Sequence, residues 1–543
     1  MSTSREVDVL IIGAGVNGAG VFRDLCLQGL TCAIVDKGDF GSGTSAAPSR
    51  LIHGGIKYLE TGEFRLVAES TLERNLLLRN APHLVKPLRT IIPMFSWFKG
   101  VVASLRTLLG STKAPRSRGA VLIEIGLTMY DFYGRRHRVM PKHRFWSKAR
   151  AKEELPALTD RVVAAGAYYD ALITAPERLV MEVVQDGLRA QPTSFAMTYA
   201  AARGIEGDCI KVTDASGATH LIAPKTVVNA AGPWIDQANA TLGVQTKLIG
   251  GTKGSHIILD NPELVEMLNG QMIYYEANDG RICLVFDYLG KALVGSTDIR
   301  ADDPDAVICG DDEIDYILES LEELLPGISV TRDQIEYTYS GIRPLPASDG
   351  TAVGLISRDH SAPVVEPEGA RTYPIVSLVG GKWTTFRGFS EEVTDLVLKR
   401  LGRARRVSTR ELAIGGGRDY PDDPEAWARD FPDPARARVL LDRYGTTARG
   451  ILEAEAGQPR MLGNALAYSE QEIAWVTAHE HVVHLIDIVI RRTQLAVIGA
   501  LNKAALAEIA SIAGKVLDWD ATRISNEISM TRRILAERHH VTL

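Results

Sequence analysis

A glycine pattern near the start of the chain constrains the fold more than any other feature. Gly13, Gly15 and Gly18 follow a continuous, β-branched apolar run at residues 7–12 and precede residues with helical spacing. In such a strand, turn and helix, backbone N–H groups at the start of the helix can approach a pyrophosphate. The pattern therefore predicts a doubly wound α/β fold that binds a dinucleotide.

A second strand supports this interpretation. Residues 31–35 end at Asp36, eighteen residues past Gly18, where the carboxylate can accept a hydrogen bond from a ribose 2′-hydroxyl. Strand, helix, second strand and acid together are a strong signal, whereas the glycine pattern alone is weak. The alternative is a glycine turn selected only for tight packing. The pattern leaves open whether FAD or NAD is bound.

The length of the chain predicts several domains. Its 543 residues exceed the about 250 to 300 that one hydrophobic core usually serves. Helical spacing is found at residues 64–79 and 176–189, and alternating strands at 254–259, 280–285 and 292–295 indicate a separate antiparallel layer. We interpret Gly415–Pro434, with three consecutive glycines, as a linker, and the chain from Ala435 onward as almost wholly helical.

Charge and cysteine usage exclude several classes of protein. The formal net charge of −6 gives no reason to expect nucleic acid as a partner. The five cysteines are odd in number and contain no CxxC spacing, so reduced thiols in the cytoplasm are expected. No signal peptide is evident, and no run reaches the about 20 apolar residues of a membrane span. His479, His481 and His484 lack a completing cysteine or carboxylate pattern, so no metal site is expected.

A segment from Gly41 to Leu59 narrows the choice of cofactor. Its glycines and small hydroxyl residues suit a chain that runs beside a diphosphate and a flavin ring, with His53 and Arg50 as donors. With this segment, the sequence resembles the FAD-dependent glycerol-3-phosphate dehydrogenase family, in its aerobic, membrane-associated type, within the D-amino-acid-oxidase-like flavoproteins. The resemblance continues in the same order through residues 63–67, 81–84, 125–131, 229–234, 253–257, 295–298, 339–345, 357–359, 380–387 and 490–493.

The resemblance implies an FAD-binding Rossmann-like domain, an interleaved antiparallel-sheet substrate domain and a helical C-terminal domain. Within an oxidoreductase region of residues 1–400, the FAD-binding domain would come from about residues 1–90, 160–240 and 335–400. The substrate, or cap, domain would come from about residues 91–159 and 241–334. A linker at 401–434 and a helical domain at 435–543 would follow.

The resemblance also implies a reaction. This is the oxidation of sn-glycerol 3-phosphate to dihydroxyacetone phosphate, with hydride passing to FAD and electrons continuing to membrane quinone. An oxidase that passes electrons to oxygen, or a dehydrogenase of another polyol phosphate, remains an alternative. A catalytically silent, membrane-bound flavoprotein that serves as a binding module is an alternative of a different class.

Four residues are expected to act in catalysis. Hydride leaves a secondary alcohol only as a base accepts the hydroxyl proton. We expect His53 to accept this proton as the base or to relay it. His256 is expected to orient the substrate. In the family, the arginine of Ser-Gly-x-Arg-Pro-Leu and the lysine of Gly-Gly-Lys lie near flavin and substrate. The resemblance implies the same position for Arg343 and Lys382. Arg343 could instead stabilise the developing alkoxide.

Further residues are expected to bind substrate and cofactor. Lys57, Tyr58 and Arg358 would hold phosphate, although each cation alone could be an ordinary surface charge. Lys57 replaces an arginine that is usual in the family, and lysine offers a point charge rather than a planar fork. The residues expected to bind FAD are Gly13, Gly15, Asn17, Gly18, Asp36, Thr44, Ser45, Ser49, Arg50, Ala231, Gly232, Gly381 and Thr384. Thr384 would open a second helix, whose N-terminus favours negative charge on the flavin.

A basic stretch raises the question of a membrane surface. Between Ile91 and Arg150, twelve Lys or Arg residues stand against two acids, and residues 95–109 combine aromatics, aliphatics and cations as an interfacial helix does. The alternative is a solvated charged face beside a packed helix. The resemblance implies quinone as acceptor and a cytoplasmic protein that is peripheral on the inner face of the cytoplasmic membrane. A homodimer is also considered.

Overall fold

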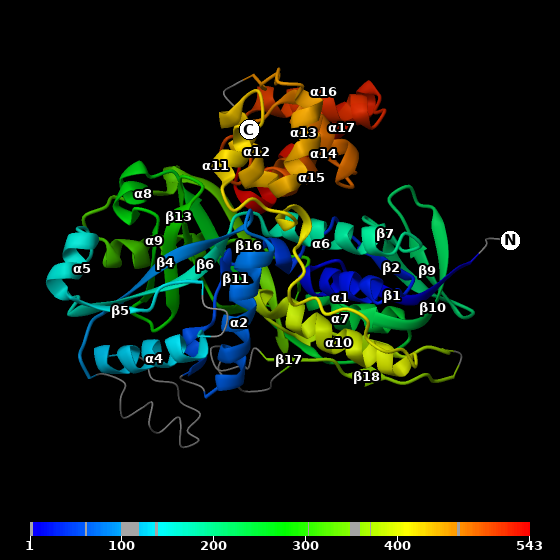
Figure 1. Ribbon diagram of the computed structural model, residues 1–543, viewed down its shortest axis with the longest axis horizontal. Coiled ribbons are helices and arrows are strands. Elements are labelled where there is room, and N and C mark those ends of the chain that lie inside the picture. The colour runs from blue at the N-terminus through cyan, green and yellow to red at the C-terminus, as the bar shows by residue number, and fades with distance from the viewer. Residues whose placement is uncertain are drawn as a thin grey trace.

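The computed structural model contains two β-sheet halves side by side, with the C-terminal helices above their junction (Figure 1). It describes residues 4–59, 62–98, 119–135, 139–301, 303–347, 359–369, 371–463 and 467–543. None of the helices in these ranges is both long and apolar enough to span a bilayer.

The first half is built on a mainly parallel sheet, as the glycine pattern predicted. Strand β1 (Arg5–Ile12) pairs in parallel with β10 and β2, in the order β18-β19-β10-β1-β2-β7. Val9, Leu10 and Ile11 are fully buried because both faces of β1 are covered. The strands expected at residues 7–12 and 31–35 are confirmed. The other strands of this sheet in the described chain are β2 (Cys32–Val35), β7 (Phe195–Met197), β8 (Ala201–Glu206), β9 (Cys209–Thr213), β10 (Thr219–Asn229), β18 (Val364–Val365) and β19 (Ile375–Ser377).

Three helices cover one face of this sheet. They are α1 (Val16–Leu27), α6 (Pro176–Ala190) and α10 (Phe386–Arg400), and they bury Leu25, Val183 and Phe389 in one core with the strands. Helix α7 (Ile235–Thr241) lies on the other face. Because α1 begins directly after the glycine turn at the end of β1, its N-terminus lies at the carboxyl edge of the sheet. The helices predicted at residues 64–79 and 176–189 are confirmed as α2 (Phe64–Asn80) and α6.

The second half is built on a larger, mainly antiparallel sheet. It confirms the strands expected at residues 254–259, 280–285 and 292–295 as β11 (Ile249–Leu259), β13 (Ile282–Tyr288) and β14 (Lys291–Gly295). The same half contains helices α4 (Ala120–Tyr133), α5 (Lys148–Glu154), α8 (Pro262–Leu268) and α9 (Asp311–Leu324). Its strands in the described chain are β3 (Leu51–Ile52), β4 (Val85–Met94), β5 (Arg144–Ser147), β6 (Ala164–Ile173), β11 (Ile249–Leu259), β12 (Gln271–Glu276), β13 (Ile282–Tyr288), β14 (Lys291–Gly295), β15 (Ile299–Arg300) and β16 (Ile335–Pro346).

The second sheet also recruits segments that the sequence assigned to the FAD-binding domain. Strand β6 pairs with β4 along its whole length, and β16 pairs with β11, so residues 164–173 and 335–346 contribute to this sheet. These strands have an apolar pattern that fits either sheet, and the choice depends on pairing between distant segments. A third, two-stranded sheet joins β17 (His360–Ser361) to β20 (Val379–Gly380). The division of the chain into domains stays our proposal.

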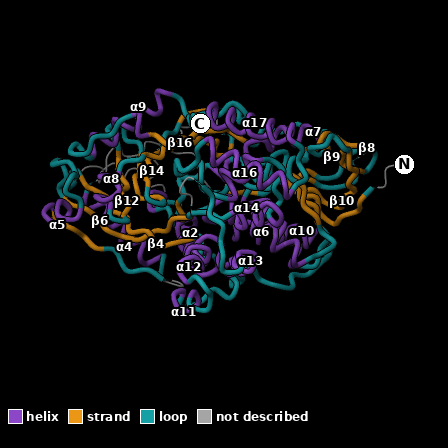
Figure 2. Tube along the Cα trace, turned by 90° about the horizontal axis from the view of Figure 1, so that it is seen from above, coloured by secondary structure: helices purple, strands orange, loops and turns teal. Residues whose placement is uncertain are grey.

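The C-terminal part is helical, as expected from Ala435 onward. Its helices bury Leu485, Ile488 and Leu506 in one core with Ile258 and Phe286 of the second sheet. Seen from above, they lie over the junction of the two halves (Figure 2). They are α11 (Pro424–Ala428), α12 (Pro434–Tyr444), α13 (Ala448–Glu455), α14 (Glu470–His479), α15 (Leu485–Asp487), α16 (Lys503–Val516) and α17 (Ala521–His539).

The three consecutive glycines do not form an open linker. Gly415, Gly416 and Gly417 are buried in a short 3₁₀ turn. A Cβ on Gly416 would lie 1.9 Å from the carbonyl oxygen of Tyr444, and one on Gly417 would lie 2.3 Å from that of Asn80. The glycines are therefore required for close backbone crossing between the C-terminal helices and the first half.

Candidate functional site

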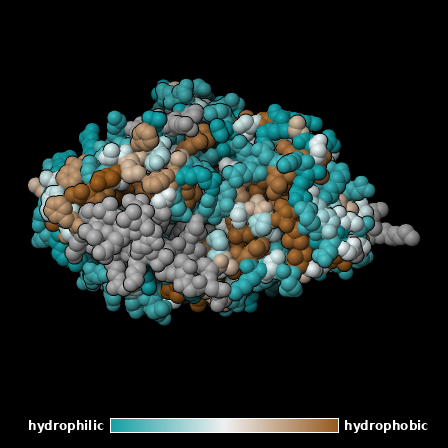
Figure 3. Space-filling view, turned by 90° about the horizontal axis from the view of Figure 1, so that it is seen from below, coloured by the Kyte–Doolittle hydropathy of each residue, from teal (hydrophilic) through white to brown (hydrophobic). Residues whose placement is uncertain are grey.

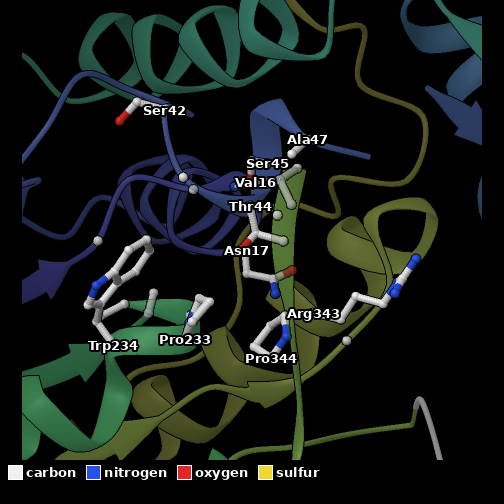
Figure 4. A pocket seen from close by; sticks show the side chains of 18 of the residues that line it. Val16, Asn17, Ser42, Thr44, Ser45, Ala47, Pro233, Trp234, Arg343 and Pro344 are labelled. Atoms are coloured by element: carbon white, nitrogen blue, oxygen red, sulfur yellow. Dashed lines mark hydrogen bonds between the residues drawn. The ribbon is translucent and has the colours of Figure 1, made fainter. Parts of the chain in front are cut away.

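A cavity of about 770 Å³ lies between the two halves, and this volume suits a cofactor with a small substrate. One side is formed by the carboxyl ends of β1 and β2 and by the turn after β10; the other is formed by β11 and β16. Figure 4 shows Asn17, Thr44 and Ser45 beside the start of α1, with Trp234 and Arg343 on opposite sides of the view. This is the position at which open α/β sheets bind ligands.

The glycine turn forms a tight backbone cradle. Gly13 has a φ of +102°, and a Cβ there would lie 2.6 Å from the carbonyl oxygen of Ala230. Gly15 lines the cavity at the N-terminus of α1, where Ser45 Oγ accepts a hydrogen bond of 2.9 Å from the N–H of Val16. Gly18 does not line the cavity. A Cβ on Gly18 would lie 2.0 Å from the carbonyl oxygen of Gly13, so Gly18 supports the turn by packing.

Asp36 lies at the end of β2, as predicted, and lines the cavity. Its Oδ2 accepts a hydrogen bond of 2.6 Å from the N–H of Ala14, and its Oδ1 accepts one of 2.8 Å from the N–H of Gly38. Burial raises the pKa of Asp36 to about 6, although these two N–H groups act to lower it. At neutral pH the carboxylate is therefore ionised and can accept from a ribose hydroxyl.

The residues present fit FAD. Backbone N–H groups at the start of α1 face a cavity that Asp36 also lines. A second helical turn begins at Trp383, beside Gly381 and Thr384. Asn17 Oδ1 is buried in this cavity and has no hydrogen-bond partner among the described residues, as expected of a group that meets a ligand. The other lining residues that the sequence assigned to FAD are Thr44, Ser45, Ser49, Ala231 and Gly232.

Arg343 brings positive charge into the cavity from β16. Its Nη1 donates to Asp298 Oδ1 at 2.9 Å, and its Nη2 donates to Ser296 Oγ and to the carbonyl oxygen of Thr297, each at 3.3 Å. A Cβ at Gly254 of β11 would lie 2.2 Å from Arg343 Nη2. The absence of a side chain at Gly254 therefore makes room for the guanidinium.

Lys382 adds a second cation to the same cavity. Its Nζ donates to Ser70 Oγ at 3.0 Å and to the carbonyl oxygen of His53 at 3.4 Å, and it lies 4.5 Å from the ring centre of Tyr58. Thr384 Oγ1 also donates to the His53 carbonyl, at 3.3 Å. The structure thus brings His53, Tyr58, Lys382 and Arg343 to one cavity.

His256 lines the cavity as a buried, neutral imidazole. Its Nε2 lies 2.8 Å from Ser49 Oγ, and its ring stacks on Tyr339 with centres 4.9 Å apart. Burial, together with the charges of Arg343 and Arg50, lowers the pKa of His256 to about 3. Its Nδ1 has no partner among the described residues. His256 can therefore exchange a hydrogen bond with a ligand but holds no charge at neutral pH.

The low pKa of His256 predicts a loss of stability in acid. Between pH 6.5 and about 3, an unfolded histidine binds a proton that the folded His256 does not, so the unfolded state gains as pH falls. From pH 7 to pH 5, this group should lower the free energy of unfolding by about 2 kcal/mol. The variant His256→Gln should lose correspondingly less over the same interval, measured by denaturant unfolding at both pH values. An equal loss in the variant and the parent chain would contradict the prediction.

Besides Gly18, three of the expected contacts lie elsewhere or outside the described residues. Arg50 was expected to donate to the cofactor but does not line the cavity: its Nη2 pairs with Glu177 Oε1 at 3.0 Å, and its Nη1 donates to Tyr288 Oη at 2.9 Å. That expectation is wrong for its side chain, because burial beside a carboxylate satisfies the guanidinium internally. Lys57 lines a different, apolar cavity. Arg358 lies outside the described residues.

The cavity residues that sequence reasoning missed include two cations, an acid and an aromatic side chain. Lys37 Nζ lies 2.9 Å from Asp305 Oδ1 and 4.2 Å from the ring centre of Trp234, whose Nε1 donates to Asp305 at 3.1 Å. Arg538 of α17 lines the same cavity. Lys37 directly follows Asp36, and Trp234 ends the motif at residues 229–234, so both could have been found. Asp305 and Arg538 have no local signal.

The second cavity, of about 180 Å³, has mainly apolar walls. Its lining includes Ile56, Lys57 and Leu59 of a short 3₁₀ turn, whereas Tyr58 of the same turn lines the large cavity. Nearby residues exposed to solvent include Trp97, Phe98, Ile125, Phe132 and Phe145. Figure 3 shows apolar surface on this lower side, beside the grey residues. The basic segment at residues 99–118 lies outside the described residues.

Comparisons with family models, with curated relatives and with solved structures point to the same protein family. A model of the FAD dependent oxidoreductase family matches residues 8–396, and a model described as the C-terminal domain of alpha-glycerophosphate oxidase matches residues 407–524. A glycerol-3-phosphate dehydrogenase of Synechocystis sp. is 34% identical, over 96% of this chain and 95% of that protein. A D-erythritol 1-phosphate dehydrogenase of Brucella abortus is 29% identical, over 91% and 95%. The solved glycerol-3-phosphate dehydrogenase from Bacillus halodurans, complexed with FAD, has the same fold, with a TM-score of 0.75, 21% identity and coverage of 99% and 95%.

Proposed function

The chain belongs to the FAD-dependent oxidoreductases, in the family of the glycerol-3-phosphate dehydrogenases, and from this we propose that it oxidises sn-glycerol 3-phosphate to dihydroxyacetone phosphate. The observation that carries the proposal is a single cavity that joins the glycine cradle for FAD to two cations, Arg343 and Lys382. A phosphorylated alcohol needs such cations for binding and for polarisation of the reacting oxygen.

The chemistry that FAD supplies when bound is the acceptance of a hydride, here from carbon 2 of the substrate. As the carbon loses this hydride, with its two electrons, His53 accepts the proton of the substrate hydroxyl, and the carbon–oxygen bond becomes a carbonyl. Arg343 and Lys382 hold the substrate oxygen and stabilise negative charge on it. His256, which is neutral, orients the substrate by a hydrogen bond.

Tyr58 lines the cavity that holds the two cations, and we keep Tyr58 and Arg358 as proposed phosphate contacts. We do not propose Lys57 as a phosphate contact, because it lines the apolar cavity. Arg50 is not kept as a cofactor contact, because its guanidinium is paired with Glu177.

The test is an anaerobic titration of the purified flavoprotein, followed by the visible absorbance of FAD. We expect sn-glycerol 3-phosphate to bleach the flavin at lower concentration than D-erythritol 1-phosphate or unphosphorylated glycerol. Preferential bleaching by the erythritol phosphate would favour a dehydrogenase of another polyol phosphate, which the Brucella abortus relative makes a defined alternative. Failure of every polyol phosphate to bleach would favour a silent binding module and overturn the proposal.

We also propose that the electrons pass to a quinone at a membrane surface. One support is the apolar cavity, which is lined by the residues on either side of Tyr58 in the chain, whereas Tyr58 itself lines the large cavity. A second support is the exposed aromatic residues Trp97, Phe98 and Phe132 at or near α4. Steady-state turnover with a soluble quinone analogue should exceed turnover with oxygen alone, and the protein should sediment with anionic lipid vesicles. Equal turnover with oxygen would favour an oxidase. Homodimer formation stays a prediction.

A further inference from the structure

The loop after β2, residues 36–44 and here called the β2 loop, is shared between the cofactor cavity and the C-terminal helices. Asp36, Lys37, Ser42 and Thr44 line the cavity. Asp39, in the middle of the loop, is fully buried and does not line it. The Asp39 backbone carbonyl accepts a hydrogen bond of 2.7 Å from Ser42 Oγ, and the N–H of Gly41 donates to the carbonyl oxygen of Ala14 at 2.9 Å. The position of Asp39 therefore affects the whole loop.

Two arginines of the C-terminal part hold the Asp39 carboxylate. Arg492 makes a bidentate contact, with Nη1 2.6 Å from Oδ2 and Nη2 2.8 Å from Oδ1. Arg491 Nε donates to Oδ2 at 2.6 Å. Burial alone would raise the pKa of Asp39, but the charges of Arg492 and Arg491 outweigh burial and lower it to about 2. The carboxylate is therefore ionised throughout the neutral range, and the two arginines that balance its charge lie far along the chain.

The arginines are themselves fixed. Both end a π-helical turn at Ile488–Arg492, a geometry that is rare and frequently found at functional sites. Arg492 Nε donates to the carbonyl oxygen of Glu480 at 2.8 Å, and the carbonyl of Arg492 accepts a hydrogen bond of 2.8 Å from Arg178 Nη2 of α6. Arg178 in turn forms a bidentate pair with Glu480, at 2.7 and 2.9 Å.

A second set of contacts fastens the same loop. Arg491 Nη2 donates to Asp487, which also accepts from the hydroxyl of Tyr199. The backbone N–H of Tyr199 donates to the carbonyl oxygen of Gly38 at 2.8 Å. The ring of Phe40 packs edge-on against His481, with centres 5.4 Å apart. The β2 loop is thus held on both sides of Asp39.

We propose that the C-terminal helices retain the cofactor, because Arg491 and Arg492, acting through Asp39, hold the β2 loop in the shape that binds FAD. Arg491 and Arg492 are positioning residues, since neither lines the cavity. Without them, the loop samples other shapes, and the apparent affinity for FAD falls in proportion to the fraction of molecules that keep the competent one. The inference depends on FAD as cofactor and is independent of the substrate.

The experiment measures FAD binding without any substrate. FAD fluorescence is followed during titration of apoprotein, and the melting temperature of the apoprotein is recorded in parallel. Arg492→Met should raise the Kd for FAD at least about tenfold, because it leaves the buried Asp39 carboxylate with Arg491 and the N–H of Phe40 but without its bidentate partner. Arg492→Lys keeps the charge but not the bidentate contact, and should raise the Kd at least about threefold.

The matched control is Arg436→Met. Arg436 is also a buried arginine of the C-terminal helices, and it pairs with Glu455 and Glu472 at 2.6 Å each, away from the β2 loop. Its loss should lower the melting temperature of the apoprotein and leave the Kd for FAD within about twofold. An equal rise in Kd for Arg436→Met and Arg492→Met would overturn the proposal, because it would indicate general destabilisation.

A double variant tests whether Arg492 acts through Asp39. In the Asp39→Asn background, Arg492→Met should add little to the rise in Kd, since the partner is already lost. Full additivity of the two changes would overturn the proposal. If Arg492→Met does not fold, Arg492→Lys decides: a Kd equal to that of the parent chain within about twofold would also overturn it.

Discussion

Arg343→Ala should slow anaerobic flavin reduction by glycerol 3-phosphate by about 10² to 10³-fold while FAD stays bound. The guanidinium is the cation that β16 presents to the cavity, and it is preoriented by Asp298 and Ser296. Because it lies in a partly desolvated site, its interaction with a developing alkoxide or with phosphate is stronger than in water. Stopped-flow absorbance of the flavin measures the rate, and the yellow colour after gel filtration measures retention of FAD.

Two further variants test whether the slower flavin reduction is specific to the guanidinium of Arg343. Arg343→Lys keeps a charge without the planar fork and should give an intermediate rate. Arg332→Ala removes an exposed arginine that pairs with Asp311 and Asp315 at the start of α9, and it should reduce at the parent rate. A parent-like rate for Arg343→Ala would remove Arg343 from the site. Loss of FAD from that variant would show instead that Arg343 supports the cofactor.

Gly13→Ala should yield a colourless protein, with a Kd for FAD raised at least about 100-fold. The φ of Gly13 is +102°, a value that residues with a side chain rarely adopt. An added Cβ would also lie 2.6 and 2.7 Å from the carbonyl oxygen and carbon of Ala230, and backbone atoms cannot yield as a side chain can. The turn must therefore move, and it carries the N–H groups that face the pyrophosphate. Absorbance at the flavin band and far-UV circular dichroism are the measurements.

Gly217→Ala is the matched control for this change. Gly217 also has a positive φ, of +83°, but a Cβ there would meet no atom within 4 Å. The variant should lose about 1 to 2 kcal/mol of stability from backbone strain and bind FAD normally. A yellow Gly13→Ala protein with a parent-like Kd would contradict the assignment of the cradle.

Much of the cofactor site could be predicted because its signals are local. Gly13, Gly15 and Asp36 are spaced by the geometry of one strand, one turn and one helix, so their positions follow from short-range rules. Arg343 and Lys382 were expected from motifs of the family that the sequence resembles, and the structure places both side chains in the cavity. Their chemical roles stay predictions.

The failures have a common physical cause. Arg50 stands in a segment that suits a flavin, but its direction is decided by Glu177, a buried acid on α6. Lys57 and Tyr58 are neighbours in the sequence, yet the 3₁₀ turn directs them to different cavities. The glycines at 415–417 have the composition of a linker, but backbone crossing with Tyr444 and Asn80 requires them to be buried. Side-chain direction and packing partner are not local properties.

The sequence by itself determined the βαβ unit, a site for a dinucleotide and the helical end of the chain, because each follows from the periodicity and spacing of nearby residues. Only the tertiary structure decided that β6 and β16 join the second sheet and that Arg538 reaches the cofactor cavity. It also decided that Asp39 meets Arg492, more than 450 residues later. Such pairs depend on how whole layers pack against one another, and a buried charge finds its partner only after that packing is complete.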